Sequence, residues 1–449
     1  MFLRYARWVT DKFILVMLGL FPLFVGFRVH AYTAVTAAKF RFFSVATGSW
    51  LAVVAVLLII GLVRGERYHP RPRAAHFFMA LFLLIGAVSA AFSEYGDVCL
   101  IGADRYDGFL TTAMYGAIFY GVSFLAVPRR RYVWALAISG TICCVIALLQ
   151  LGGLDPFLLY PEGLNYYDKY EAMNAPFLGT IGNTGLLAAY LCLMAPLLSV
   201  FSVLSDKPAD TWLLLPGALA LGVLLLCDID AGIVALAVCV LVTVPMVIRR
   251  RRPARIAAGI AGGVTLAGLG ALYFWPGTSG TLWELSQVLH GNLSDEFGSH
   301  RGQIWKQCWQ LFLEKPWLGG GPGTNSERID IRWSRFIEVL GRERIVVVGN
   351  THNVYLGYLM SIGVIGAAAY IAGAACSLVT WFRRRRDGAL FPALGSAFLC
   401  YMVQDFFGIG LCLTSPMMWV VWALLESPDP VPENGPEAEE PEPEPEAVS

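Results

Sequence analysis

Long apolar runs dominate the pattern of hydrophobic and polar positions along the 449-residue chain. About 17 to 25 mostly apolar residues are enough to cross a bilayer as a helix. The chain holds twelve runs of this kind, near residues 12–28, 43–63, 75–93, 108–127, 132–151, 182–204, 211–227, 229–248, 255–275, 353–380, 388–406 and 409–425. The pattern therefore predicts an all-α polytopic membrane protein with about twelve transmembrane helices.

Basic residues indicate the orientation of these helices. They gather in short runs between apolar segments, at 64–73, 129–131, 249–255 and 383–386. With the amino terminus inside and twelve crossings, all four runs face the cytoplasm, as the positive-inside rule requires. Arg28, Lys39 and Arg41 in the first outer loop depart mildly from that rule. We expect a multi-pass protein of the cytoplasmic (inner) membrane with both termini in the cytoplasm.

Composition supports this class and excludes several functions. Hydrophobic residues make up 57% of the chain, charged residues 15%, and the mean hydropathy is +0.60. The ten cysteines include no C-x-x-C pair and no Cys/His group with zinc spacing, so we expect no metal site. The chain has no P-loop, dinucleotide-binding or serine-elbow motif, which argues against a nucleotide cofactor. We also expect no nucleic-acid partner.

Polar segments divide the chain into four parts. Residues 1–275 hold helices 1–9, residues 276–351 form a large outer loop, and residues 352–425 hold helices 10–12. A polar loop of this length between membrane helices is usually functional. Residues 426–449 are rich in Pro and Glu, which predicts a disordered, solvated tail.

A histidine stands where the outer loop ends and the tenth helix begins. The sequence predicts Thr351 as the N-cap, with His352 and Asn353 in the first turn. The positive end of a helix dipole suits an anionic ligand and disfavours protonation of the histidine. His352 is thus a candidate proton acceptor. The alternative is an interfacial histidine followed by a Gly-x-x-Gly packing face.

The outer loop also holds an arginine at the start of a predicted helix. Ser299 is a candidate cap, and Arg301 and Trp305 share one face. An apolar stripe at helical spacing lies beside them, formed by Ile304, Cys308, Leu311 and Phe312. The glycine-rich run 315–325 then ends the helix and predicts a flexible turn. A helix lying on the membrane surface is the alternative interpretation.

Three further polar residues lie near the outer ends of predicted helices. Arg105 precedes the fourth helix, where it either extends harmlessly to the interface or adds a second cation for a phosphate. Asn183 lies at the mouth of the sixth helix as a cap or polar contact. Asp405 lies near the outer end of the eleventh, and a carboxylate at membrane depth is a functional candidate. The aromatic and acidic loop 152–181 suits either sugar rings or an interfacial aromatic belt.

These motifs resemble the O-antigen ligase and O-antigen polymerase family of bacterial envelope glycan enzymes. The strongest match is His352-Asn353 followed, after nine residues, by Gly363-Val364-Ile365-Gly366. The family's Arg-helix-Pro-x-x-Gly-x-Gly pattern is matched by Arg301, Ile304, Trp305, Pro316, Gly319 and Gly321. Weaker family features are matched by Arg105, Gly108, Gly182 and Asn183.

The resemblance implies a GT-C-type membrane glycosyltransferase that works without a cofactor or a metal. Such an enzyme transfers a glycan from an undecaprenyl-pyrophosphate carrier to a hydroxyl of a cell-envelope glycan, lipid or protein. His352 would orient or deprotonate the acceptor, and Arg301 would hold the pyrophosphate. Substrate contacts would come from Arg105, Asn353, Asn183, Trp305 and Asp405.

One departure from the family pattern keeps other functions open. Family ligases carry an arginine at the hairpin between helices 7 and 8, where this chain has Asp228 and Asp230. The site is then compensated by Arg105, serves another donor, or is degenerate. The sequence does not separate a ligase from a repeat-unit polymerase. A proton-coupled transporter or flippase, and a non-catalytic scaffold for envelope precursors, also remain open.

Overall fold

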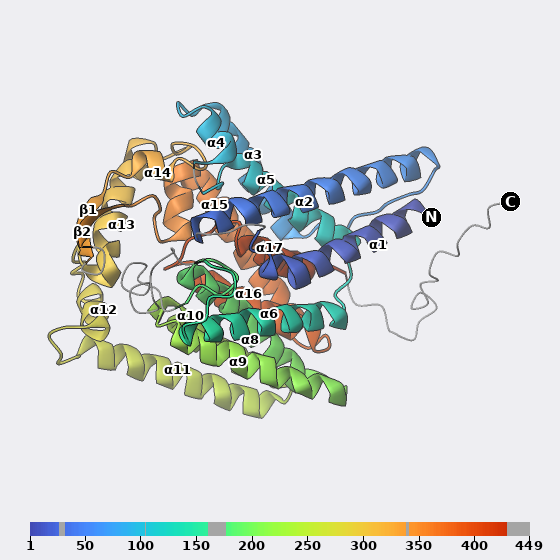
Figure 1. Cartoon of the computed structure of the whole chain (residues 1–449). Helices are drawn as coiled ribbons and strands as arrows, with labels where there is room; N and C mark the ends of the chain where they lie inside the picture. The colour runs from blue at the N-terminus through green and yellow to red at the C-terminus, as the bar shows by residue number, and fades with distance from the viewer. Residues whose placement is uncertain (27–31, 104, 160–176, 338–340, 429–449) are drawn as a thin grey trace.

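The computed structural model describes residues 1–26, 32–103, 105–159, 177–337 and 341–428, and most of them are helical (Figure 1). In this part of the chain, the only strands are β1 Arg332–Ile337 and β2 Arg342–Val347, which pair antiparallel. Eight described helices have the length and hydropathy to span a membrane. The prediction of an all-α polytopic membrane protein is confirmed, while the count of twelve and the GT-C class stay predictions.

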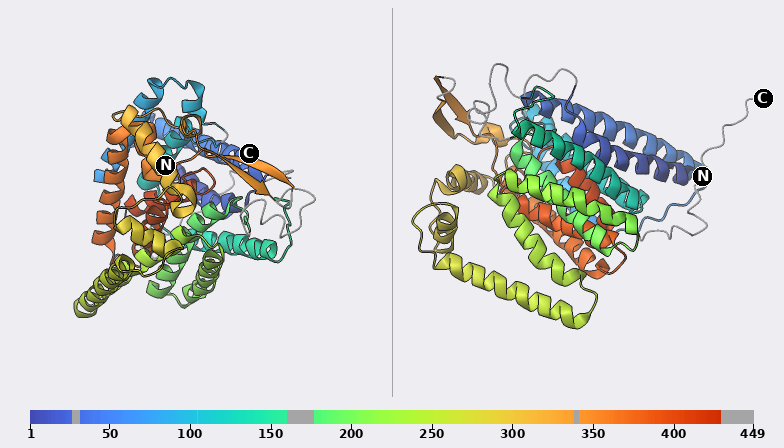
Figure 2. Two further views of the ribbon diagram at one scale, coloured as in Figure 1. Left: turned by 90° about the vertical axis from the view of Figure 1, so that its left-hand side faces the viewer. Right: turned by 60° about the horizontal axis from the view of Figure 1, so that its bottom comes forward.

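Each of the twelve apolar runs overlaps a helix. These helices are α1 Phe2–Leu15, α2 Tyr32–Val63, α3 Ala74–Ala91, α5 Phe109–Leu125, α6 Arg130–Leu151, α8 Thr184–Leu204, α9 Leu214–Leu226, α10 Asp230–Val247, α11 Arg251–Tyr273, α15 Val354–Arg384, α16 Leu390–Gln404 and α17 Ser415–Glu426. A short helix, α4 Asp97–Ile101, lies between α3 and α5. The helices form one bundle, with α11 along its edge (Figures 1 and 2).

The centre of the bundle is helix α8. Nearly all of its side chains are buried, since it packs against α9 and α16. A helix that is apolar all round belongs in such a position. On α17, the rings of Trp419 and Trp422 stack with centroids 4.8 Å apart, and both side chains are fully buried. Apolar packing thus fixes the frame that carries the polar segments.

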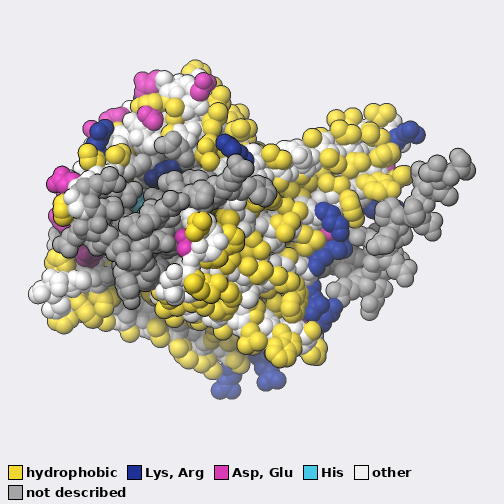
Figure 3. Space-filling model, in the orientation of Figure 1, with side chains coloured by type: hydrophobic (Ala, Val, Ile, Leu, Met, Phe, Trp, Pro, Cys, Tyr) yellow, Lys and Arg dark blue, Asp and Glu magenta, His cyan; other side chains and the backbone are white. Residues whose placement is uncertain are grey.

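The two ends of the bundle differ in charge. One end carries the arginine-rich runs 64–73, 129–131, 249–252 and 383–386, and we call it the basic end. The opposite end carries the outer loop and the β1–β2 pair, and we call it the loop end (Figure 2). On the face shown in Figure 3, acidic side chains gather mainly toward the loop end. This segregation agrees with the orientation that the basic runs predict.

The first two helices begin earlier than predicted. Helix α1 starts at Phe2 because its first turns are amphipathic and bury Ala6 and Thr10. Helix α2 starts at Tyr32, so Lys39 belongs to a helix and not to an outer loop. The buried Lys39 ammonium donates to the carbonyls of Phe21 at 2.9 Å and Pro22 at 3.1 Å. These contacts explain the apparent exception to the positive-inside rule at Lys39.

The carboxyl-terminal boundary also differs by one residue. Glu426 ends α17, is buried, and pairs with Arg73 at 3.4 Å, so its assignment to a solvated tail was wrong. The predicted disorder of the remaining tail concerns residues 429–449, which lie outside the described residues.

The described residues of the outer loop form three helices, α12 Thr281–Leu289, α13 Phe297–Glu314 and α14 Asn325–Arg328. The predicted apolar stripe of α13 is buried at Ile304, Cys308 and Phe312. Ile304 and Cys308 pack in a cluster with Ile329, Ile331, Val348 and Met360. The stripe therefore faces the rest of the protein and not a bilayer surface.

The glycine-rich run docks into a break in α15. Gly363 interrupts this helix with a φ of 70°. Around the break, the Gly320 and Gly321 N–H groups donate to the carbonyls of Met360 and Ser361 at 3.0 and 2.8 Å. Pro316 accepts from the Val364 N–H at 2.8 Å. The run predicted as a flexible turn is thus bound along its backbone to α15.

A side chain at Gly363 has no room. A Cβ there would lie 2.2 Å from the Trp317 carbonyl oxygen, and the positive φ disfavours any L-residue. We expect Gly363→Ala to lower the free energy of unfolding by about 2–5 kcal/mol, combining backbone strain and overpacking. Thermal unfolding and limited proteolysis of the outer loop measure this effect. Gly262→Ala in α11, where a Cβ meets nothing within 4 Å, is the control. Equal unfolding temperatures for the two variants would contradict the prediction.

Candidate active site

His352 lies in the short segment that leads into α15. The helix begins at Val354, and Asn353 is its N-cap, because Asn353 Oδ1 accepts from the Leu356 N–H at 3.0 Å. The predicted cap, Thr351, was two residues too early; its hydroxyl donates to the Asn353 carbonyl at 2.7 Å. His352 therefore lies outside the first turn, with a positive φ of 48°. Few residues other than glycine adopt this backbone, and such strain gathers at functional sites.

Two contacts hold this segment in place. Trp305 Nε1, from α13, donates to the Thr351 carbonyl at 3.1 Å. The Val354 N–H donates to the Asp405 carbonyl at 3.0 Å. The Trp305 ring also contacts Phe406, with centroids 5.9 Å apart. The outer loop and the end of α16 thus hold the histidine segment by one hydrogen bond each.

Arg301 comes to the site because α13 is broken just before it. Gly298, Ser299 and His300 all have positive φ, and among the described residues the Ser299 side chain forms no capping hydrogen bond, so the prediction of Ser299 as a cap was wrong. The break brings Arg301 Nη1 to the Gly298 carbonyl at 2.6 Å. Arg301 Nε is buried and has no hydrogen-bond partner among the described residues. A buried cationic donor without a partner is typical of a site for an anion.

The electrostatics keep His352 neutral. Burial lowers its pKa most, and with the positive charges of Arg301 and Arg105 the pKa falls to about 4. The prediction of a neutral imidazole agrees with this value, and its causes are burial and two guanidinium groups. Within the described residues, the His352 ring forms no hydrogen bond. An unprotonated ring nitrogen is therefore available to a ligand.

Arg105 belongs to the loop between α4 and α5. A Cβ at Gly349 would lie 3.4 Å from Arg105 Nη2, so this arginine lies against the segment that carries His352. The loop is closed by the Gly108 N–H, which donates to the Ile101 carbonyl at 3.2 Å. Two guanidinium groups from segments far apart in the sequence thus act on one histidine.

The α9–α10 hairpin adds an acid to the same site. Burial lowers the pKa of Arg301, and the nearby Asp230 carboxylate opposes that shift. Thr281 Oγ1 donates to Asp230 Oδ2 at 3.2 Å. The residue that replaces the expected hairpin cation is therefore a counter-charge for Arg301.

Two other candidate residues differ in their relation to this group. Asn183 caps α8, accepting from the Leu186 N–H at 3.0 Å, as one of the two interpretations predicts. No contact recorded for the described residues joins Asn183 to His352 or Arg301. Asp405 is buried beside the histidine segment, and its Oδ1 has no hydrogen-bond partner among the described residues. Much of the aromatic loop 152–181 lies outside the described residues.

Arg328 is a buried residue that sequence reasoning missed. Its Nη1 donates to the Met360 carbonyl and its Nη2 to the Leu311 carbonyl, both at 2.8 Å. These bonds tie the end of α13 to the break in α15. The sequence holds no signal for this role, because Arg328 stands in a polar stretch beside Ser326, Glu327 and Asp330.

A small cavity of about 70 Å³ lies against the same segment. Asp107, Asn325, Thr351 and Tyr358 are among the residues that line it. Burial raises the pKa of the Asp107 carboxyl. Asn325 Oδ1 is buried without a hydrogen-bond partner among the described residues. The cavity is large enough for ordered water beside the site.

Comparison with known families gives the class of this site. In the part of the chain that the structure describes, no three His, Cys, Asp or Glu side chains gather as metal ligands. Residues 215–371 match the family model for O-antigen ligase. The chain carries an O-antigen ligase domain. This confirms the family that the motifs resemble, and no curated protein matches the chain.

The O-antigen ligase domain covers about a third of the chain, from the start of α9 into α15. Arg301, Trp305, His352, Asn353 and Asp230 lie inside it. Arg105, Asn183 and Asp405 lie outside it, and Arg105 comes to the site only through the fold. The family places the protein among multi-pass membrane proteins that process glycans by ligation or polymerisation.

Proposed function

We propose that the chain is a GT-C-type glycosyltransferase that transfers a glycan from an undecaprenyl-pyrophosphate carrier to an acceptor hydroxyl outside the cytoplasmic membrane. One observation carries the proposal: the neutral His352 ring lies within electrostatic reach of two guanidinium groups. Such a site combines a proton acceptor with an anion-binding group. The O-antigen ligase domain supports the substrate class.

In the proposed reaction, the acceptor oxygen bonds to the anomeric carbon as the bond from that carbon to the pyrophosphate oxygen breaks. The hydroxyl proton passes to His352, and the electron pair leaves with the lipid pyrophosphate. Arg301 and Arg105 stabilise the charge that grows on this leaving group. These residues act in this way only while substrate is bound at the loop end.

The neighbouring residues position this chemistry. Trp305 fixes the Thr351 carbonyl, and Asn353 fixes the start of α15, so both hold the histidine. Asp405 contributes its carbonyl to the same segment. Asn183 caps α8 through its Oδ1, and its part in substrate binding stays a prediction.

The pH dependence follows from the low pKa of His352. A base acts only when deprotonated, and with a pKa of about 4 the deprotonated form predominates from pH 7 down to about that pH. We expect transfer to stay nearly constant from pH 7 to 5 and to fall only near pH 4. The pH profile of kcat/KM in proteoliposomes measures this limb. A fall centred near pH 6.5 would show an unshifted histidine.

The function is tested with full-length protein in liposomes that hold a fluorescent undecaprenyl-pyrophosphate glycan and envelope acceptors. Glycan on the acceptor identifies a ligase, and lengthened lipid-linked glycan identifies a polymerase. In a deletion strain, the corresponding signs are unligated full-length glycan and single repeat units. Movement of intact lipid-linked glycan driven by a proton gradient, without transfer, would replace the proposal with a transporter. No transfer and no movement across several acceptors would leave a scaffold.

A further inference from the structure

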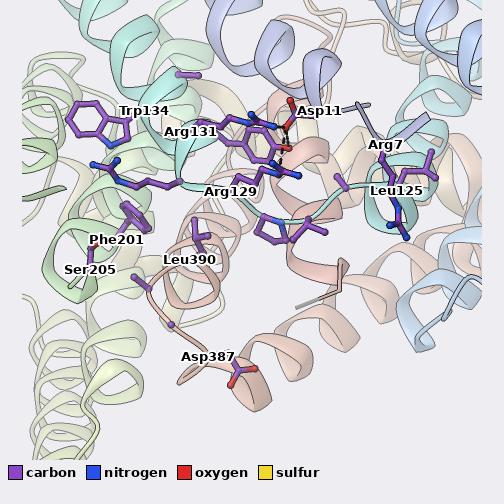
Figure 4. Close-up of a pocket in the computed structure, with 18 of the residues that line it drawn as sticks. Arg7, Asp11, Leu125, Arg129, Arg131, Trp134, Phe201, Ser205, Asp387 and Leu390 are labelled. Atoms are coloured by element: carbon purple, nitrogen blue, oxygen red, sulfur yellow. Dashed lines mark hydrogen bonds and ion pairs between the residues drawn. The ribbon is translucent and has the colours of Figure 1, made fainter. Parts of the chain in front are cut away.

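A second, larger cavity opens at the basic end, far from His352 in the fold. It has a volume of about 1460 Å³ and lies among α1, α6, α8 and the turn before α16 (Figure 4). It is independent of the small cavity beside the proposed active site, with which it shares no lining residue. The proposed glycosyl transfer uses none of its residues.

Basic side chains line this cavity in excess. Seven Lys and Arg residues face five Asp and Glu residues; the basic ones are Arg4, Arg7, Arg67, Arg129, Arg130, Arg131 and Lys207. Four of the acidic residues form ion pairs with cations. Asp11 pairs with Arg131, and Asp210 pairs with Arg130 at 2.5 Å. Glu66 pairs with the terminal amino group, and Asp387 lies 3.7 Å from Arg384.

Three of the arginines have no such partner. Arg4, Arg7 and Arg67 are exposed and form no ion pair with any described residue. In Figure 4, Arg7 lies to the right of Arg129 and Arg131, whose side chains converge on Asp11. Unpaired guanidinium groups around a cavity favour a phosphate, because their planar forks match its oxygens.

Most of the remaining lining is apolar. Leu3, Leu125, Ile138, Phe201 and Leu390 all face the cavity. Ile138 is 60% exposed and belongs to a helix that can span the membrane, so this wall continues onto the lipid-facing surface. A ligand that fills the cavity therefore meets cations on one side and hydrocarbon on the other.

We propose that this cavity binds an anionic phospholipid, with the phosphate head group on Arg4, Arg7 and Arg67 and the acyl chains along the apolar wall. Basic pockets between transmembrane helices on the cytoplasmic side are suited to anionic head groups. The volume exceeds that of a typical small-molecule pocket of roughly 300–1,000 Å³, which leaves space for part of the chains. A soluble phosphate compound shares the head-group chemistry but leaves the apolar wall uncovered.

The test is native mass spectrometry of the full-length protein with phosphatidylglycerol or phosphatidylcholine. We expect the protein to retain phosphatidylglycerol with a preference of about tenfold or more. The triple variant Arg4→Gln/Arg7→Gln/Arg67→Gln should lose that preference. The control Arg249→Gln/Arg251→Gln/Arg252→Gln removes the same charge from exposed residues at the same end and outside the cavity, and it should keep the preference.

Three outcomes of this experiment would overturn the proposal. Equal retention of both lipids removes the anionic site, and an equal loss in the control variant shows general surface charge. Abolition of the preference by excess inorganic phosphate assigns the cavity to a soluble ligand. If the cavity variant fails to fold, photo-crosslinkable phosphatidylglycerol on the natural protein should label residues 1–7 and 125–138. Labelling spread evenly over the basic end would contradict the cavity.

Discussion

Replacing His352 by Asn should reduce kcat for glycan transfer by about 10²–10⁴, the usual contribution of a general base. Asn adopts positive φ more readily than most residues, so it preserves the backbone at φ 48° while removing the proton acceptor. The natural ring forms no hydrogen bond with the described residues, so little stability should be lost. Transfer rates in proteoliposomes, at equal amounts of folded protein, measure the effect.

His300→Asn is a closely matched control. His300 also lies in the outer loop with positive φ, is exposed, and contacts the Trp333 ring at 4.8 Å. A surface substitution of this kind should leave transfer within about twofold. If the two variants transfer equally well, His352 has no part in proton transfer, although the enzyme itself would stand.

The sequence predicts the parts of this site better than their assembly. The apolar stripe of α13 predicted which face is buried, and the spacing from His352 to Gly363 identified the family. Neither pattern predicts that Arg105 lies against Gly349, because the two residues are more than 200 positions apart in the sequence. Such contacts depend on helix packing, which periodicity does not encode.

Backbone geometry explains the errors near the helix starts. Thr351 and Ser299 both have the composition of an N-cap, but the chain enters α15 and α13 through residues with positive φ. Tertiary contacts override local preference at these points, since Trp305 holds the Thr351 carbonyl and the glycine-rich run fills the break at Gly363. The strain lies beside the candidate chemistry, where local rules are expected to fail.

The acid at the hairpin changes how the leaving group must be held. Asp230 attracts Arg301 and partly balances its charge, so the free site has less positive potential than three cations would give. In the proposed reaction, an incoming pyrophosphate would compete with Asp230 for the same guanidinium. Arg105, which lies on another segment and also acts on His352, would supply the second cation in the proposed reaction. The departure from the family pattern therefore makes Arg301 more important to the proposed reaction.

Arg301→Gln should lower kcat by about 10²–10³, as expected when a donor to a developing charge is removed. The same change should move the acidic limb of the pH profile upward. Arg301 helps to lower the pKa of His352 to about 4, so its loss raises that pKa toward the ordinary 6.5 and protonates the base at a higher pH. Arg301→Lys keeps a charge but loses the fork, so it should recover the pH profile more than the rate. Transfer rates and pH profiles in proteoliposomes separate the two effects.

Lys306→Gln tests whether any cation on α13 matters. Lys306 is exposed and pairs with Asp295 at 2.6 Å, and its loss should leave both the rate and the profile within about twofold of the natural protein. If Arg301 only held the structure together, its loss would lower the rate without moving the acidic limb, because the pKa of the catalytic base would not depend on the charge of Arg301. Full transfer with an unchanged profile in Arg301→Gln would remove this arginine from the site. The upward shift in Gln, reversed in Lys, is the result that only a cation beside the base produces.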